Sequence, residues 1–174
     1  LAVRWRDEGV VGFDIAGAEA GYPPTRHLDA FQYIQRSNFH TTIHAGEAYG
    51  PASIAQAIHY CGAHRIGHGI RLKEDGELLN YVNDHRIPLE ICLSSNVHTK
   101  SVKSLELHPF RFFYDYGLRL SLNTDNRLMS NTTVSEEYLK AHQNFGFSYE
   151  DLKKIILDSC KSAFLPHHDK VSLL

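Results

Sequence analysis

Three short polar clusters in this 174-residue chain each follow an apolar, β-branched run, and together they carry the side chains that a hydrolytic metal site uses. The clusters are His44–Glu47 (His-Ala-Gly-Glu), Ile66–Gly69 (Ile-Gly-His-Gly) and Asn123–Asp125 (Asn-Thr-Asp). Each apolar run is predicted to be a strand, so the polar residues stand at strand ends. Parallel-barrel enzymes place their chemistry there, and imidazole and carboxylate groups suit a metal-activated water. The pattern therefore indicates metal-dependent hydrolysis.

Individual roles follow from the chemistry of each side chain. His44 and Asp125 are candidate metal ligands, because imidazole nitrogen and carboxylate oxygen both bind zinc and its neighbours. Glu47 begins a loop, where a carboxyl group is well placed to shuttle a proton beside a metal-bound water. His68, between two glycines, could orient that water or help to deprotonate it. Structural alternatives are a core histidine for His44, a turn histidine for His68 and a capping aspartate for Asp125.

Residues beside these positions are candidates for substrate binding. Gly17 could present its backbone N–H to a ligand, and it could equally be a plain turn glycine. Asn126 could donate a hydrogen bond to a substrate acceptor. Ser95 and Asn96 are typical of a turn with capping roles, and we expect no catalytic part for them. The chain has 12 histidines. All of them except His44 and His68 lack metal-ligand spacing and are expected to be structural or exposed.

The elements that position these residues alternate between strand and helix. Apolar runs predict strands over residues 10–16, 39–43, 65–67, 88–93 and 118–122. Stripes at helical spacing predict helices over residues 24–36, from 51 onward, around 78–82, and over 108–116, 134–144 and 149–164. This alternation is typical of α/β proteins built from parallel βαβ units. A doubly wound open sheet fits the pattern too, but reactive side chains after nearly every strand favour a TIM (β/α)8-type barrel.

The chain accounts for about the last five β/α units of such a barrel, which takes roughly 250 residues. It opens at Leu1 without an initiator Met and soon enters a strand, so residues 1–174 are interpreted as the C-terminal part of a single barrel domain. No linker or low-complexity segment divides them. Five units leave two unpaired sheet edges, so we expect the 174-residue polypeptide by itself to be poorly soluble or to self-associate.

Composition narrows the range of partners. A formal net charge of −2 argues against a nucleic-acid or membrane-surface partner, which would need a basic face. No apolar stretch approaches the roughly 20 residues of a membrane span. Cys61, Cys92 and Cys160 are widely spaced, which indicates reduced, mostly buried thiols and a cytoplasmic protein. The oligomeric state is left open.

Other catalytic signatures are absent from the sequence. It contains no G-x-S-x-G, no P-loop and no G-x-G-x-x-G. The H-x-E and P-C-x-x-C pair of the zinc deaminases that act on flipped bases is missing as well. A deaminase with this sequence would therefore use a different scaffold.

Taken together, the motifs resemble the adenosine deaminase family of metal-dependent amidohydrolases. The matching segments are Phe13–Gly17, His44–Glu47, Arg65–Gly69, Ser94–Asn96, Asn123–Asp125 and Lys161–Phe164. The resemblance covers almost the whole chain and implies a (β/α)8 barrel with one zinc ion. It also implies the hydrolytic deamination of adenosine or deoxyadenosine to inosine and ammonia in purine salvage, with a purine nucleoside as the small-molecule partner.

The resemblance assigns roles residue by residue. His44 resembles the family's third histidine ligand of zinc, and Asp125 resembles its aspartate ligand. Glu47 resembles the proton donor to the purine nitrogen next to the attacked carbon. His68 resembles the histidine that positions and polarises the zinc-bound hydroxide. Gly17 resembles the glycine whose backbone N–H meets the purine ring.

Departures from the family pattern matter for the function. The H-x-H of the first strand, which supplies two zinc ligands, occurs nowhere in this sequence. Asn126 stands where many relatives have a second aspartate that must be protonated to donate to a purine nitrogen. An asparagine amide donates at any pH, so we expect Asn126 to keep this role with a different pH dependence. Ala18 replaces an acid that relatives often carry, which leaves the substrate preference open.

Three alternatives therefore stay open. The first is a sister deaminase of the same family that acts on adenine or on a modified nucleoside such as aminofutalosine. The second is a different barrel metallohydrolase, which the lack of a lysine at any strand end disfavours. The third is a non-enzyme, an inactive fragment or pseudoenzyme that lacks the H-x-H metal ligands.

Overall fold

A five-stranded, all-parallel sheet forms the centre of the computed structural model, which describes residues 1–174. Its strands are β1 (Gly12–Ile15), β2 (His40–Ala45), β3 (Arg65–His68), β4 (Leu89–Ile91) and β5 (Leu120–Leu122). They lie side by side in chain order, and every neighbouring pair is parallel. This order contains no switch point, so the barrel-type winding is confirmed and the doubly wound alternative is wrong.

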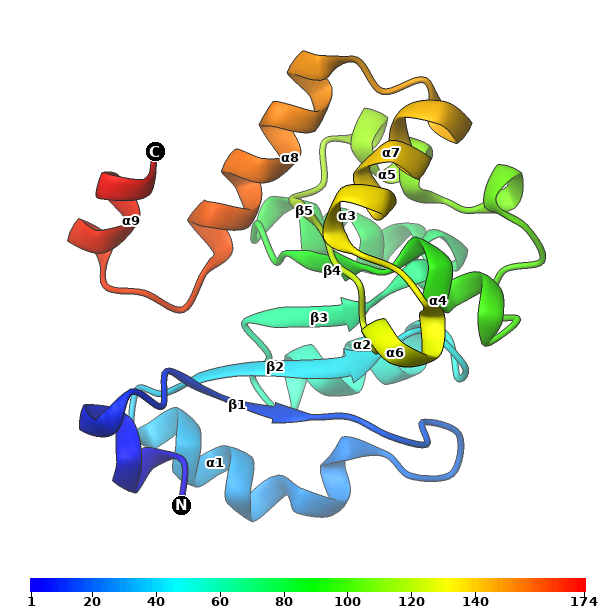
Figure 1. Ribbon diagram of the computed structural model, residues 1–174. Coiled ribbons are helices and arrows are strands. Elements are labelled where there is room, and N and C mark those ends of the chain that lie inside the picture. The colour runs from blue at the N-terminus through cyan, green and yellow to red at the C-terminus, as the bar shows by residue number, and fades with distance from the viewer.

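Five α-helices lie between successive strands, and four more follow β5. They are α1 (Leu28–Arg36), α2 (Pro51–His59), α3 (Gly76–Asp84), α4 (Leu93–His98), α5 (Phe110–Tyr116), α6 (Arg127–Ser130), α7 (Val134–Phe145), α8 (Tyr149–Ser162) and α9 (His167–Leu173). Short 3₁₀ helices span Val3–Glu8, Pro24–His27, Ile70–Glu74 and Leu105–Leu107. Figure 1 shows the arrowheads of β1, β2 and β3 on one side, where α4 and α6 also lie.

The two faces of the sheet differ in chemistry because side chains alternate along each strand. In β2, Thr41, Ile43 and Ala45 are fully buried, and the latter two belong to a core cluster of 26 apolar residues. The intervening side chains of β2 are only partly buried, and Thr42 and His44 line a cavity on the opposite face. The strands therefore build an apolar face toward the helices and a polar interior.

Helix boundaries follow local signals. Pro51 starts α2 at a position where its missing N–H costs nothing. A capping box starts α8, since Ser148 and Asp151 each bond to the other's backbone N–H. A second capping box, between Thr133 and Glu136, starts α7. Phe31 and Ile34 are the buried stripe of α1, and the predicted helix 24–36 divides into a 3₁₀ turn and α1.

The turn predicted at Ser95 and Asn96 is wrong, because both residues lie inside α4. Serine and asparagine favour loops when their side chains bond to the local backbone. Here the Glu137 carboxylate, on α7, instead accepts hydrogen bonds from the backbone N–H of Ser94, at 3.1 Å, and from its hydroxyl. A contact across 43 residues therefore decides the local structure.

The segment after α8 returns to the amino ends of the strands. The Phe164 ring stacks on His40 with centroids 4.7 Å apart, and the Arg65 guanidinium carbon lies 3.6 Å from the Phe164 ring centroid. Arg65 also donates to the backbone oxygen of Ser162 at 3.2 Å. The chain is thus anchored at the end of the sheet opposite to α4 and α6.

The cysteines are unpaired thiols, as predicted. Cys61 and Cys92 are buried and Cys160 is partly buried. None of the helices combines the length and apolar character needed to cross a bilayer. The cytoplasmic location and the self-association of the isolated polypeptide stay predictions.

Candidate active site

His44, Glu47 and His68 converge at the carboxyl ends of β2 and β3. One ligand atom of each lies within 4.8 Å of the others. His44 Nε2 lies 3.6 Å from Glu47 Oε2, and His68 Nδ1 lies 3.7 Å from Glu47 Oε1. Glu47 and His68 are buried, while His44 is partly buried. A buried carboxyl group between two imidazoles can bind a cation or move a proton.

Glycines allow the two chain segments to approach each other. Gly46 has a φ of 75°, and an added Cβ would overlap Ile54 and lie 3.2 Å from the Gly69 Cα. Non-glycine residues at the site are also held in the left-handed region, with φ of 63° at His68 and 54° at Asp125. Such backbone is costly for L residues and tends to occur at functional sites.

Asp125 follows β5 and faces the same interior from the other side. It lines a cavity of about 270 Å³ together with His44 and His68. The Ser95 hydroxyl, on α4, donates to Asp125 Oδ2 at 2.7 Å, which orients the carboxylate. Asp125 is exposed and does not belong to the tight group of His44, Glu47 and His68. The structure thus places both predicted metal ligands on one cavity without bringing them into contact.

Carboxylates around His44 make the site attractive to a cation. Burial by itself would lower the pKa of His44, but a hydrogen bond to Glu19 and the charges of Glu47, Glu19 and Asp125 raise it. Burial outweighs the other influences at His68 and lowers its pKa. The site therefore favours a positive charge beside His44, which a proton or a metal ion would supply. Imidazole and carboxylate donors fit zinc.

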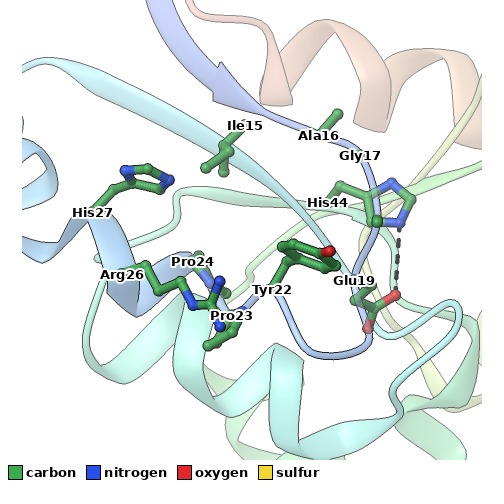
Figure 2. A pocket seen from close by; sticks show the side chains of 11 residues that line it. Ile15, Ala16, Gly17, Glu19, Tyr22, Pro23, Pro24, Arg26, His27 and His44 are labelled. Atoms are coloured by element: carbon green, nitrogen blue, oxygen red, sulfur yellow. Dashed lines mark ion pairs between the residues drawn. The ribbon is translucent and has the colours of Figure 1, made fainter.

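Glu19 is a site residue that the sequence analysis did not single out. Its carboxylate accepts hydrogen bonds from the backbone N–H groups of Gly46, Glu47 and Ala48 at 2.7–3.0 Å and from the Ser53 hydroxyl. Its Oε2 also lies 3.6 Å from His44 Nε2. A dashed line marks this ion pair in Figure 2. Glu19 therefore holds the loop that carries Glu47.

We expect the substitution Glu19→Ala to lower the free energy of unfolding by about 2–5 kcal/mol, because it leaves buried N–H groups without acceptors. Urea denaturation measures this loss, with Glu8→Ala at an exposed position as the control.

The contribution of Glu19 to stability depends on pH. Burial would raise the pKa of Glu19, but hydrogen bonds from His44, Ser53 and the backbone hold it well below its ordinary 4.5. This contribution to stability is therefore present above about pH 4.5 and is lost as the pH falls toward the folded-state pKa. A loss below about 0.5 kcal/mol at neutral pH would contradict this role.

Asn96 is the second residue whose role was missed. It is fully buried, and its amide nitrogen donates to Glu47 Oε1 at 2.7 Å and lies 3.1 Å from His68 Nδ1. Its amide oxygen lies 3.1 Å from Nε2 of the buried His108. Asn96 therefore links the two central site residues, although the sequence predicted only a capping role for it.

Glu47 also contacts two hydroxyl groups from the segment after α4. Thr99 Oγ1 and Ser101 Oγ lie 3.0 and 3.2 Å from Glu47 Oε1, the same oxygen that accepts from Asn96. An amide nitrogen can only donate, so Oε1 must accept. A proton on the Glu47 carboxyl group is therefore favoured on Oε2, the oxygen that faces His44.

Gly17 and Asn126 lie farther from this cluster. Gly17 has a φ of 133°, and it lines a cavity of about 370 Å³ with Glu19, Tyr22 and His44. Figure 2 shows Gly17 on the stretch of chain beyond Ala16, close to His44. The Asn126 side-chain oxygen accepts from Met129 N–H at 3.1 Å and caps α6, so its amide nitrogen remains the free donor. Asn126 does not line the cavity shared by His44 and Asp125.

The comparison with known families decides the relationship of this chain. A family model described as "Adenosine deaminase" matches residues 1–174, which is the whole chain. The chain belongs to the adenosine deaminase family. The predicted resemblance is thereby confirmed.

Individual relatives agree with this family. An adenosine deaminase from Mycobacterium sp. (strain JLS) is 50% identical over 185 residues, which cover 100% of this chain and 51% of the relative. The crystal structure of an adenine deaminase from Arthrobacter aurescens superposes with a TM-score of 0.91 at 26% identity, over 99% of this chain and 55% of that one. The Arabidopsis N6-mAMP deaminase gives a TM-score of 0.89 at 34% identity, over 99% and 51%. The chain thus spans about half the length of these deaminases.

Proposed function

We propose that residues 1–174 are the C-terminal part of a single metal-dependent barrel domain that hydrolyses adenosine or deoxyadenosine to inosine and ammonia. The observation that carries this proposal is the buried Glu47 between His44 and His68 at the strand ends. A carboxyl group there can give a proton to a ring nitrogen, and the imidazoles can bind and orient the nucleophile. The substrate would be a small purine nucleoside, as in purine salvage.

Zinc is the metal that we propose for this site, one ion per domain. His44 and Asp125 would hold it from this chain, and the remaining ligands would come from an H-x-H outside residues 1–174. When bound, zinc lowers the pKa of water toward about 7 and so supplies a nucleophile at neutral pH. The negative charge of Glu19, Glu47 and Asp125 around His44 supports a divalent cation.

The chain's own residues would divide the remaining work. Glu47 would hold a proton on Oε2 and pass it to the purine nitrogen next to the attacked carbon. His68 would position the attacking water by a hydrogen bond. Gly17 N–H and the Asn126 amide would contact acceptors of the purine ring. Water then adds at the amino-bearing carbon, the carbon–nitrogen bond breaks, and ammonia leaves.

A sister deaminase is the second candidate, because the deaminases of known structure that share this fold include enzymes named for adenine and for N6-mAMP. The 50% identity to an adenosine deaminase supports adenosine as the first choice. Ala18, beside Gly17, lies on the lining of the larger cavity and is a position where this preference could be set.

A substrate panel tests the proposal. The zinc-loaded protein, extended toward its amino end to the length of its relatives, is offered adenosine, deoxyadenosine, adenine, N6-methyl-AMP and aminofutalosine at equal concentrations. We expect the highest kcat/KM for adenosine or deoxyadenosine. A higher kcat/KM for any of the other three would replace the proposed substrate, and no turnover of any of them would support the non-enzyme alternative.

A further inference from the structure

A buried series of hydrogen bonds connects the first residue of α5 to the candidate active site. The N–H of Phe110 donates to His108 Nδ1 at 3.1 Å, and His108 Nε2 lies 3.1 Å from Asn96 Oδ1. The Asn96 amide nitrogen lies 2.7 Å from Glu47 Oε1 and 3.1 Å from His68 Nδ1. The two side chains in the middle of this hydrogen-bonded series belong to Asn96 and His108, which are 0% and 4% exposed. We call these two residues the Asn96–His108 relay.

The first bond fixes the direction of every later one. A backbone N–H can only donate, so His108 Nδ1 must be the unprotonated nitrogen of its ring. The His108 proton then sits on Nε2 and is donated to Asn96 Oδ1. With its oxygen facing His108, Asn96 turns its NH₂ group toward the active site.

The two hydrogens of this amide have two acceptors. One is donated to Glu47 Oε1 and the other to His68 Nδ1. Nδ1 of His68 is therefore an acceptor, and the proton of the neutral ring sits on Nε2. His68 can then offer an N–H to an oxygen atom in the active site but has no free lone pair at Nε2.

We propose that the Asn96–His108 relay is a positioning device that holds His68 in its Nε2–H tautomer and Glu47 with Oε1 as the accepting oxygen. The consequence for turnover rests on the proposed deaminase function. Neither relay residue touches the reacting atoms, so both act through Glu47 and His68. This assignment makes His68 a hydrogen-bond donor to the nucleophile in the resting site.

The surroundings of His108 support a fixed relay. Burial lowers the pKa of His108 to about 3, so the ring is neutral throughout the physiological range. A protonated His108 would have no lone pair for the Phe110 N–H, and the first bond would be lost. The Phe110 and Phe145 rings pack edge-on against His108, with centroids 6.3 and 6.2 Å away. These contacts leave the ring little room to flip.

Spectroscopy tests the tautomer without reference to activity. In the zinc-loaded, full-length protein labelled with ¹⁵N-histidine, NMR distinguishes protonated from unprotonated ring nitrogens. The His68 signals are assigned by their disappearance in His68→Asn. We expect Nδ1 to be the unprotonated nitrogen of both His68 and His108. A proton on Nδ1 of His68 in the unmodified protein would overturn the proposal.

Variants test the relay itself. Asn96→Asp replaces the donating NH₂ by an accepting oxygen, so we expect the His68 proton to move to Nδ1. We expect kcat to fall by about 10- to 100-fold, the usual effect of losing such a supporting bond, with KM little changed. His108→Leu should give a similar fall, and His108→Gln, whose amide can still donate to Asn96, should restore most of it.

A control variant and two contrary results decide whether the relay positions His68 and Glu47 or only supports the fold. His142→Gln alters a histidine that bonds to the Phe147 carbonyl away from the site, and it should leave kcat unchanged. If His108→Leu and His108→Gln lose kcat equally, or if Asn96→Asp leaves the His68 proton on Nε2, the relay is only structural. If the unmodified protein releases no ammonia from adenosine, the proposed function fails, while the NMR result still decides the tautomer.

Discussion

Replacing Glu47 with glutamine is expected to lower kcat for deamination by about 10²- to 10⁴-fold, the usual contribution of a general acid. Glutamine keeps the size of the side chain and an oxygen that accepts from Asn96. It has no carboxylic proton to give to a ring nitrogen. Steady-state ammonia release from adenosine measures the effect, and circular dichroism shows whether the fold is kept.

A matched control separates this loss from a general effect of charge. Glu77→Gln removes a carboxylate from the exposed first turn of α3 and should leave kcat within about twofold of the unmodified value. KM for Glu47→Gln should change little, because the substrate still finds the same cavity. If Glu47→Gln kept more than about a tenth of the activity, Glu47 would not be the proton donor.

Removing either proposed zinc ligand is expected to cause a large loss of zinc affinity. His44→Ala and Asp125→Ala should each weaken zinc binding by more than about 100-fold, since losing only the partner of a ligand already costs about 10- to 100-fold. Ser95→Ala tests the loss of such a partner, because Ser95 donates a hydrogen bond to the proposed ligand Asp125 at Oδ2, at 2.7 Å. Competition with a chromophoric chelator measures the three affinities.

The order of these affinities is the informative result. We expect the unmodified protein to bind zinc most tightly, then Ser95→Ala, and then both ligand variants. Asp84→Ala, which removes an exposed aspartate at the end of α3, should bind zinc like the unmodified protein. Unchanged affinity in Asp125→Ala would remove Asp125 from the ligand set, and unchanged affinity in His44→Ala would do the same for His44.

The sequence predicted the strand–helix alternation and the convergence of His44, Glu47 and His68. These predictions hold because both depend on local patterns: apolar runs form the buried strands, and parallel strands bring their carboxyl ends to one edge. The predicted bounds of β4 are too long, residues 88–93 against Leu89–Ile91. The end of that run belongs to α4, which starts at Leu93.

Contacts between distant segments account for the residues that the sequence did not reveal. Asn96 bonds to Glu47 across 49 positions, and Glu19 bonds to Gly46 across 27. Asn96 belongs to the Ser94–Asn96 segment of the family resemblance, but that segment did not assign it a role, and Glu19 stands in no such motif. The only sequence signal for Glu19 was its position two residues after Gly17. An ordinary loop glutamate could stand there as well. His108 has no local signal, because only the fold buries it against Asn96.

Ammonia release from adenosine in the presence of zinc is the most direct test of the central claim. The measurement compares the 174-residue polypeptide with the same chain extended toward its amino end to the length of its relatives. The proposed function predicts ammonia from the extended protein alone, because residues 1–174 contain no H-x-H to complete the zinc ligands. The absence of ammonia from a folded, zinc-loaded extended protein would contradict the assignment of adenosine as its substrate.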